Sequence, residues 1–272
     1  MRNVLLGLCL LDWGVVDFTL FTTRPPESVL AEGRSLAQYL ADIPGEFRIY
    51  SPSYSLPQQT AAAYRLQLAD GVDPLQLQSY TAFMQSASGV PWTGYSVSVP
   101  PYSSGDPAHD NAAFQPDPIR LGWLNVRYLA ADFDLPVEGL DLVADFGSTR
   151  LYENRRWMPR AWVQPSEVIP EKQSQPAEMV RWSPDRIELQ SSGPGLLVVS
   201  EIAYPGWEVR VDGKKSQIVQ VAGLLRGVRL EPGIHQIVFS FRPISVYIGL
   251  SVGTAALFLV LLHWFRQRDP DQ

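Results

Sequence analysis

The longest apolar stretch of the chain runs from Pro243 to Leu262 and contains no charged residue. A helix needs roughly 20 such residues to cross a hydrocarbon core of about 30 Å. A core helix of a globular protein would instead show a polar stripe. Tyr247 and Trp264 lie near the two ends, and both residue types favour the headgroup level of a membrane. The pattern therefore predicts a transmembrane helix over residues 243–264.

Basic residues close to this helix predict its orientation. Arg266 and Arg268 follow it directly, and segments rich in Lys and Arg stay on the cytoplasmic side of a membrane. We expect residues 265–272 to form a cytoplasmic tail. The bulk of the chain would then lie outside the cytoplasm, anchored in the cytoplasmic membrane.

A second apolar stretch covers the N-terminus, but Asp12 and Asp17 interrupt it. A carboxylate at the centre of a membrane helix costs about 2.5 to 3.5 kcal/mol on insertion scales. No small-residue cleavage site of a signal peptide follows. We expect a transmembrane helix over residues 1–21 in which Asp12 packs against other helices. Those helices are missing from the sequence or belong to a separate protein, so Met1 is not expected to start the working protein.

Alternating hydrophobic and polar positions predict strands before the last helix. Residues 196–203 form a continuous apolar run, and residues 207–211 alternate strictly. Asp212-Gly213 is a favoured two-residue hairpin turn, and Glu231-Pro232-Gly233 is expected to turn the chain again. The pattern predicts an antiparallel β-sandwich of five or six short strands over residues 171–242.

The region upstream, residues 22–170, predicts a mixed α/β lobe. Residues 28–42 and 60–86 are rich in Ala, Leu and Gln and lack strand alternation, which favours helices. Residues 47–50 and 124–130 have the pattern of strands. The overall expectation is an α+β protein with two lobes and membrane helices.

A long segment inside this lobe, residues 88–118, is dense in Ser, Pro and Gly. A loop of that length in a compact domain is functional or disordered. It carries Trp92, Tyr95 and Tyr102, whose faces can stack on sugar rings, and Tyr204 is a further candidate for the same contact. Packing of these rings onto the lobe is the alternative. Trp207 shares strand parity with hydrophobic neighbours and is expected in the core.

Composition excludes some classes of function. The formal net charge is −6 and no long Lys/Arg run is present, so nucleic acid is not an expected partner. Cys9 is the only cysteine, which excludes an intrachain disulfide and a zinc site built from cysteines. Charged residues make up only 18% of the chain, which fits a protein partly in contact with lipid.

The remaining motifs favour structure over catalysis. Asp106, His109, Asp110 and Asn111 have suitable ligand atoms for a metal ion, but the same residue types are ordinary in turns. Residues 249–253 match a hydrolase motif yet lie in the membrane helix, where Gly249 and Gly253 instead predict a close helix-packing face. We expect no catalytic residue, no metal and no cofactor.

Four segments together resemble the YfhO-like bacterial membrane proteins. The most specific is the last, in which a Pro-Gly-Trp turn, a Val-Asp-Gly hairpin, a Pro-Gly-x-His turn and a final membrane helix follow in order. The segments are FRIYSP from Phe47, LNVRYLAA from Leu124, LYENRRWMPRAWV from Leu151, and YPGWEVRVDGKK from Tyr204 with GVRLEPGIHQIVFSFRP from Gly227.

This resemblance implies a role in the class of multi-span glycosyltransferases that use lipid-linked sugars. The chain would correspond to the family's C-terminal portion, without the N-terminal helix bundle and its acidic loop residues, so no activity is expected from the chain alone. We expect an extracytoplasmic accessory domain and anchor that assists sugar transfer to a cell-envelope acceptor, with membrane lipid and the helix bundle as partners. The alternatives are a non-catalytic module that binds envelope glycan or protein, and a truncated gene product.

Overall fold

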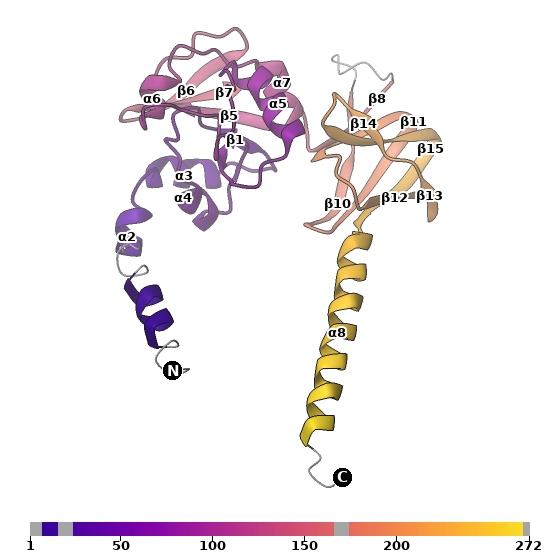
Figure 1. The fold of residues 1–272 in the computed structure, drawn as a ribbon. Helices are drawn as coiled ribbons and strands as arrows, with labels where there is room; N and C mark the ends of the chain where they lie inside the picture. The colour runs from indigo at the N-terminus through magenta and orange to yellow at the C-terminus, as the bar shows by residue number, and fades with distance from the viewer. Residues whose placement is uncertain (1–6, 16–23, 166–173, 269–272) are drawn as a thin grey trace.

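The structure, a computed structural model, describes residues 7–15, 24–165 and 174–268. It has an α/β lobe and a β lobe lying side by side (Figure 1). The helix of residues 7–15 and the long helix α8 (Ile244–Arg268) leave the two lobes on the same side (Figure 1). The predicted α+β class, with a mixed lobe, an antiparallel β-sandwich and a C-terminal apolar helix, is confirmed.

The α/β lobe is built on a five-stranded sheet in the order β2-β1-β5-β7-β6. Its first three strands are parallel, and β7 pairs antiparallel with β5 and β6. The strands are β1 (Arg48–Tyr50), β2 (Gln67–Leu68), β5 (Val126–Ala131), β6 (Leu140–Phe146) and β7 (Thr149–Asn154). Strands β3 (Gly71–Val72) and β4 (Ser98–Val99) form a separate pair.

Helices cover both faces of this sheet, which explains why β5 is apolar at almost every position. Ile49 and Tyr128 pack with side chains of α3 (Arg34–Ala41) and α4 (Gln58–Ala63). Tyr50 and Leu129 point to the other face, toward α5 (Gln78–Ser88) and α7 (Pro118–Trp123). Two short helices, α2 (Pro26–Val29) and α6 (Pro107–Asp110), lie at the periphery.

The helical prediction over residues 60–86 is confirmed at its two ends and wrong in between. Helix α4 ends at Ala63, and β2 and β3 intervene before α5 begins at Gln78. Arg65 and Gly71 both adopt positive φ, of 58° and 153°, and Pro74 follows shortly after. Positive φ and proline both end a helix, so the local Ala and Gln content is overridden.

The β lobe is an eight-stranded antiparallel sheet folded over on itself. The order is β13-β12-β15-β11-β8-β9, with β10 paired to β11 and β14 to β15. Its central strands β11 (Arg186–Ile202) and β15 (Leu225–Phe241) have 17 residues each. The others are β8 (Ala161–Gln164), β9 (Gln175–Pro176), β10 (Glu178–Ser183), β12 (Trp207–Val211), β13 (Lys214–Ser216) and β14 (Val219–Val221).

The two long strands bend together, and this bend replaces an expected turn. Gly193 pairs with Gly233, and the register then shifts so that Gly195 pairs with Leu230. The residues Glu231-Pro232-Gly233 therefore form an irregularity within one strand, not the end of one. A Cβ added at Gly193 would lie 2.0 Å from the Glu231 carbonyl oxygen, so the close approach requires glycine.

The hairpin predicted at Asp212-Gly213 is confirmed. Val211 pairs with Lys214, and the φ angles of Asp212 and Gly213 are 51° and 76°, as a type I′ turn requires. The Asp212 carboxylate accepts from the Gln236 amide at 2.9 Å and contacts His235 Nδ1 at 2.7 Å. His235 is thus a hydrogen-bonded structural residue, and this contact raises its pKa.

The two lobes share a hydrophobic core because β8 and the second half of β11 are buried on both faces. Leu197 and Val199 face the interior of the sandwich. Trp162, Leu196 and Val198 point the other way and join the same cluster as residues of α5 and α7. The boundary expected at residue 170 falls outside the described residues and stays a prediction.

Helix α8 is the one helix of the described residues that is long and apolar enough to cross a membrane, over Ile244–Arg266. The hydroxyls of Ser251 and Thr254 donate to carbonyls one turn earlier, at 2.9 and 2.8 Å, so they need no outside partner. At the N-terminus residues 7–15 are helical, but most of the span 1–21 lies outside the described residues. A second membrane helix there stays a prediction.

Candidate functional site: an aromatic groove on the α/β lobe

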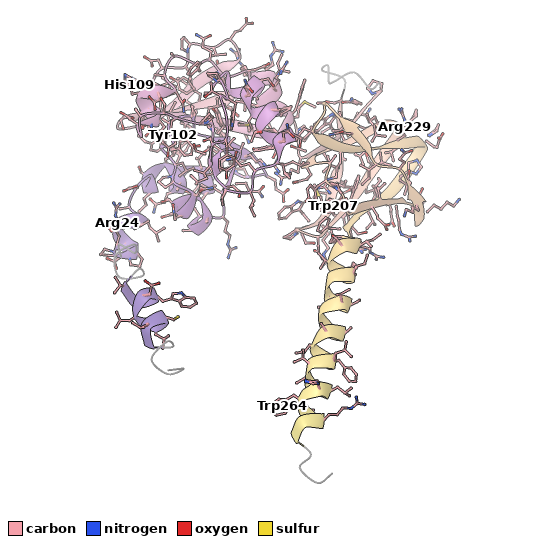
Figure 2. All side chains as sticks on the ribbon, in the orientation of Figure 1. Arg24, Tyr102, His109, Trp207, Arg229 and Trp264 are labelled. Carbon is pink, nitrogen blue, oxygen red and sulfur yellow. The ribbon has the colours of Figure 1, made fainter. Side chains whose placement is uncertain are left out.

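Residues of the segment 88–118 line a surface groove of about 470 Å³. Trp92, Tyr95 and Tyr102, singled out from the sequence, all line it, together with Asp110 and Phe114. Tyr102 lies on the part of the α/β lobe remote from the β lobe (Figure 2). The structure therefore brings three of the four candidate aromatics together.

The three rings are held in different ways. Tyr95 is 75% exposed, and its hydroxyl donates to the Pro74 carbonyl at 2.5 Å. Tyr102 is 38% exposed and stands edge-on against Tyr54, with ring centroids 5.5 Å apart. Trp92 is half-buried and packs against the core of the lobe. The groove thus has aromatic walls whose faces remain in part open to solvent.

Polar side chains near the floor of the groove are fixed by turn geometry. Asp110 accepts from the amides of Ser103 and Ser104, at 2.8 and 2.6 Å, and these hydrogen bonds lower its pKa. Buried Asn111 donates to the Pro52 carbonyl at 2.8 Å, which ties the loop to the sheet. These hydrogen bonds satisfy part of the loop's backbone and hold it against the lobe.

The Asp and His residues of this loop act in turns. Asp106 caps the first turn of α6 by accepting from the His109 amide at 3.3 Å. The His109 side chain is 85% exposed at the edge of the α/β lobe (Figure 2), and its Nδ1 lies 3.8 Å from Asp110 Oδ1. Within the described part of the chain, no group of three or more His, Cys, Asp or Glu is placed to hold a metal ion.

The other residues selected from the sequence lie elsewhere. Tyr204 is 47% exposed at the base of the β lobe, next to Phe241 just before α8. A Cβ added at Gly249 or Gly253 would meet no atom within 4 Å, so the described residues do not test the helix-packing face. Asp12 is exposed on the helix of residues 7–15, and its packing role likewise stays a prediction.

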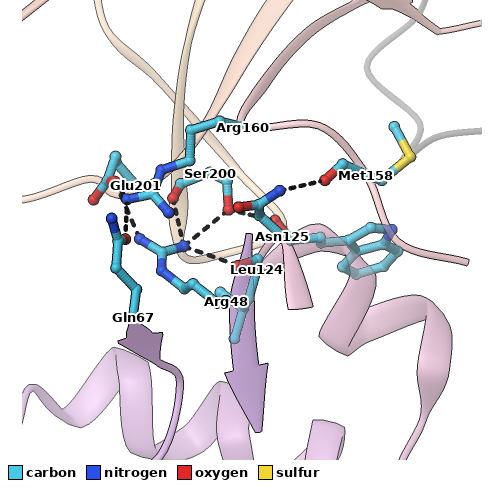
Figure 3. Close-up of polar contacts among 9 residues, drawn as sticks. Arg48, Gln67, Leu124, Asn125, Met158, Arg160, Ser200 and Glu201 are labelled. Atoms are coloured by element: carbon cyan, nitrogen blue, oxygen red, sulfur yellow. Dashed lines mark hydrogen bonds and ion pairs between the residues drawn. The ribbon is translucent and has the colours of Figure 1, made fainter. Parts of the chain in front are cut away.

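A polar network that sequence reasoning missed locks the two lobes together (Figure 3). Arg48 of β1 donates to the carbonyls of Leu124 and Ser200, both at 2.9 Å, and pairs with Glu201 at 3.1 Å. Arg160 pairs with the same Glu201 oxygen at 2.7 Å and donates to Gln67 at 2.9 Å. These residues are far apart in sequence, so no local pattern signals the network.

The network places more positive than negative charge at the junction. Arg160 is buried, and its guanidinium lies 5.7 Å from the ring of Trp182. Burial, then the nearby Arg48, lowers the pKa of Arg160 to about 10. Glu201 is the shared counter-charge of both arginines, so its removal would leave two neighbouring cations without it.

Residues 166–253 match the family described as bacterial membrane protein YfhO. This part of the chain is therefore similar to that family of membrane proteins. The match covers most of the β lobe and the start of α8, and it confirms the resemblance stated for the Pro-Gly-Trp, Val-Asp-Gly and Pro-Gly-x-His segments. No curated protein and no solved structure gives a significant match to the chain.

Proposed function

We propose that this chain is the extracytoplasmic accessory domain and anchor of a YfhO-like membrane protein, and that its aromatic groove holds a cell-envelope glycan during transfer of lipid-linked sugars. The observation that carries the proposal is the convergence of Trp92, Tyr95 and Tyr102 on one open groove. Aromatic faces beside fixed polar groups suit sugars, which have apolar faces and polar edges.

The placement of the groove supports this role. The basic residue Arg266 follows the apolar part of α8, which favours a cytoplasmic C-terminus and extracytoplasmic lobes. The shared core and the Arg48–Glu201–Arg160 network join the α/β lobe, which carries the groove, to the β lobe that continues into α8. A glycan in the groove would therefore lie at a defined position relative to a helix bundle in the same membrane.

Substitution of the groove tyrosines tests the proposal with the core left intact. Tyr95→Ala with Tyr102→Ala should lower the affinity for size-fractionated envelope polysaccharide at least tenfold, measured by calorimetry on the whole chain in detergent. Adding Trp92→Ala should abolish binding but also cost stability, since that ring packs on the core. Tyr39→Ala is the matched control, because Tyr39 is 42% exposed and stands edge-on to Phe146 outside the groove.

The same experiment separates the two roles of the rings. Unchanged thermal midpoint with lost binding supports a glycan groove. Parental affinity in the double variant, or a loss equal to that of Tyr39→Ala, would eliminate it. A large drop in midpoint with Tyr95→Ala and Tyr102→Ala would show that these rings serve the fold.

A further inference from the structure

The base of the β lobe carries a cluster of aromatic rings directly above α8. Trp207 lies against Phe241 with ring centroids 5.5 Å apart, and the centroid of Tyr204 is 6.4 Å from that of Phe241. The Arg226 guanidinium stacks on the Trp207 ring at 3.7 Å and is itself buried, which fixes the indole. Figure 2 shows Trp207 next to the start of α8.

Backbone hydrogen bonds hold three chain segments at the same level. The Phe241 amide donates to the Asp185 carbonyl at 2.8 Å, and the Arg242 amide donates to the Gly206 carbonyl at 2.6 Å. Gly206 allows this approach, because an added Cβ would lie 2.9 Å from the Phe241 ring. The β10–β11 turn, the turn of residues 204–206 and the end of β15 therefore form one rigid base.

The length of α8 sets the height of this base above the hydrocarbon. The span Ile244–Arg266 has 23 residues, which is about 35 Å of helix, against a hydrocarbon core of about 30 Å. Ile244 must then lie at the edge of the hydrocarbon or in the adjoining polar layer. That layer is roughly 5 to 8 Å deep on each side. Phe241 comes only three positions earlier, which is at most about 10 Å of chain, so the rings that contact it lie within reach of this layer.

We propose that this base, formed by Tyr204, Trp207, Phe241 and Arg242, is seated in the headgroup layer of the phospholipid membrane. Tyr and Trp place an apolar ring and a polar tip where one side is lipid and the other is water. Arg242 is exposed, so its guanidinium can bind a lipid phosphate. Because the base is joined directly to α8, the surface that it contacts is the membrane that α8 enters. The contact fixes the tilt of the β lobe, and through the shared core it fixes the height of the groove.

Site-directed spin labels in the full chain test this seating. Because Cys9 is the only cysteine, Cys9→Ser gives a background without thiols. Single cysteines replace Tyr204 at the base, Asp185 in the adjoining turn, Ser251 within α8, and Ile234, which is 72% exposed on β15 seven positions before Phe241. The chain is reconstituted in vesicles of phosphatidylethanolamine and phosphatidylglycerol. Accessibility to oxygen and to a nickel chelate then reports the depth of each label.

The labels at Tyr204 and Asp185 should show depths between those of Ser251 and Ile234, at the level of the headgroups. The Ile234 label, on an exposed apolar position of the same strand, should be as accessible to nickel as a label in water. Nickel accessibility at Tyr204 and at Asp185 equal to that at Ile234 would overturn the proposal. The label at Asp185 decides the matter if Tyr204→Cys disturbs the fold. Glycan binding plays no part in this measurement, so its outcome is independent of the proposed function.

Discussion

Asp70 is a buried carboxylate whose ionisation should destabilise the α/β lobe. It lies between β2 and β3 and is 7% exposed. Its Oδ1 accepts from the Ser51 amide at 2.7 Å, while Oδ2 is buried and has no partner in the described part of the chain. Burial raises the pKa of Asp70 to about 7 from an ordinary value of 3.8, and the Ser51 hydrogen bond only partly opposes it.

The two pKa values fix the sign and the size of the effect. Between pH 4 and 7 the native state keeps a proton that the unfolded state has lost, so the free energy of unfolding falls as pH rises. Below pH 4 both states hold the proton, and above pH 7 the cost is constant. One pKa unit corresponds to 1.36 kcal/mol, so a pKa difference of about three lowers the free energy of unfolding by about 4 kcal/mol at most.

Asp70→Asn should remove this cost, because the amide can accept from Ser51 and carries no charge. Denaturant unfolding in detergent from pH 4 to 8.5 should show the variant more stable than the parent at pH 8, by about 2 to 4 kcal/mol. The two curves should converge near pH 4. Asp145→Asn, at an exposed position of β6, is the control for loss of a carboxylate. Equal stabilities of Asp70→Asn and the parent at pH 8 would refute the argument.

Two further substitutions test the turn and the junction. Gly213→Val should lower the free energy of unfolding by about 1 to 3 kcal/mol, because Gly213 has φ of 76° and a β-branched residue resists that conformation. Gly213→Asn should lower it less. Equal unfolding midpoints for the valine variant and the parent would contradict this. Glu201→Gln should cost about 3 to 5 kcal/mol, because it leaves Arg48 and Arg160 without their shared counter-charge. Glu153→Gln, which breaks the more exposed pair with Arg127, should cost about 1 kcal/mol or less, and an equal loss in both variants would argue against the junction as described.

The parts of the fold governed by local pattern could be predicted from the sequence. The uncharged run before Leu262, the Asp212-Gly213 turn and the strands near residues 48 and 126 each depend on neighbours in sequence, and each is present. The helical prediction over residues 60–86 is wrong only between α4 and α5, because Arg65 and Gly71 take positive φ in a tertiary context that composition does not reveal.

The candidate site was predictable only in its aromatic residues. The Ser, Pro and Gly around Trp92, Tyr95 and Tyr102 indicated a surface loop, and the structure adds that the three rings share one groove. The junction was not predictable, because Arg48 and Glu201 are 153 positions apart and meet only when both lobes have folded. The bend at Gly193 and Gly233 was not predictable for the same reason, because a pairing between strands distant in sequence determines it.

The most direct test of the account is the side of the membrane on which the groove lies. In the Cys9→Ser background, Ser104→Cys places a thiol on the exposed loop beside the groove, and Asp271→Cys places one in the C-terminal tail. A membrane-impermeant maleimide applied to intact spheroplasts should label the first variant and not the second, and detergent should expose both. Labelling of Asp271→Cys with protection of Ser104→Cys would place the groove in the cytoplasm, away from any envelope glycan, and would contradict the account.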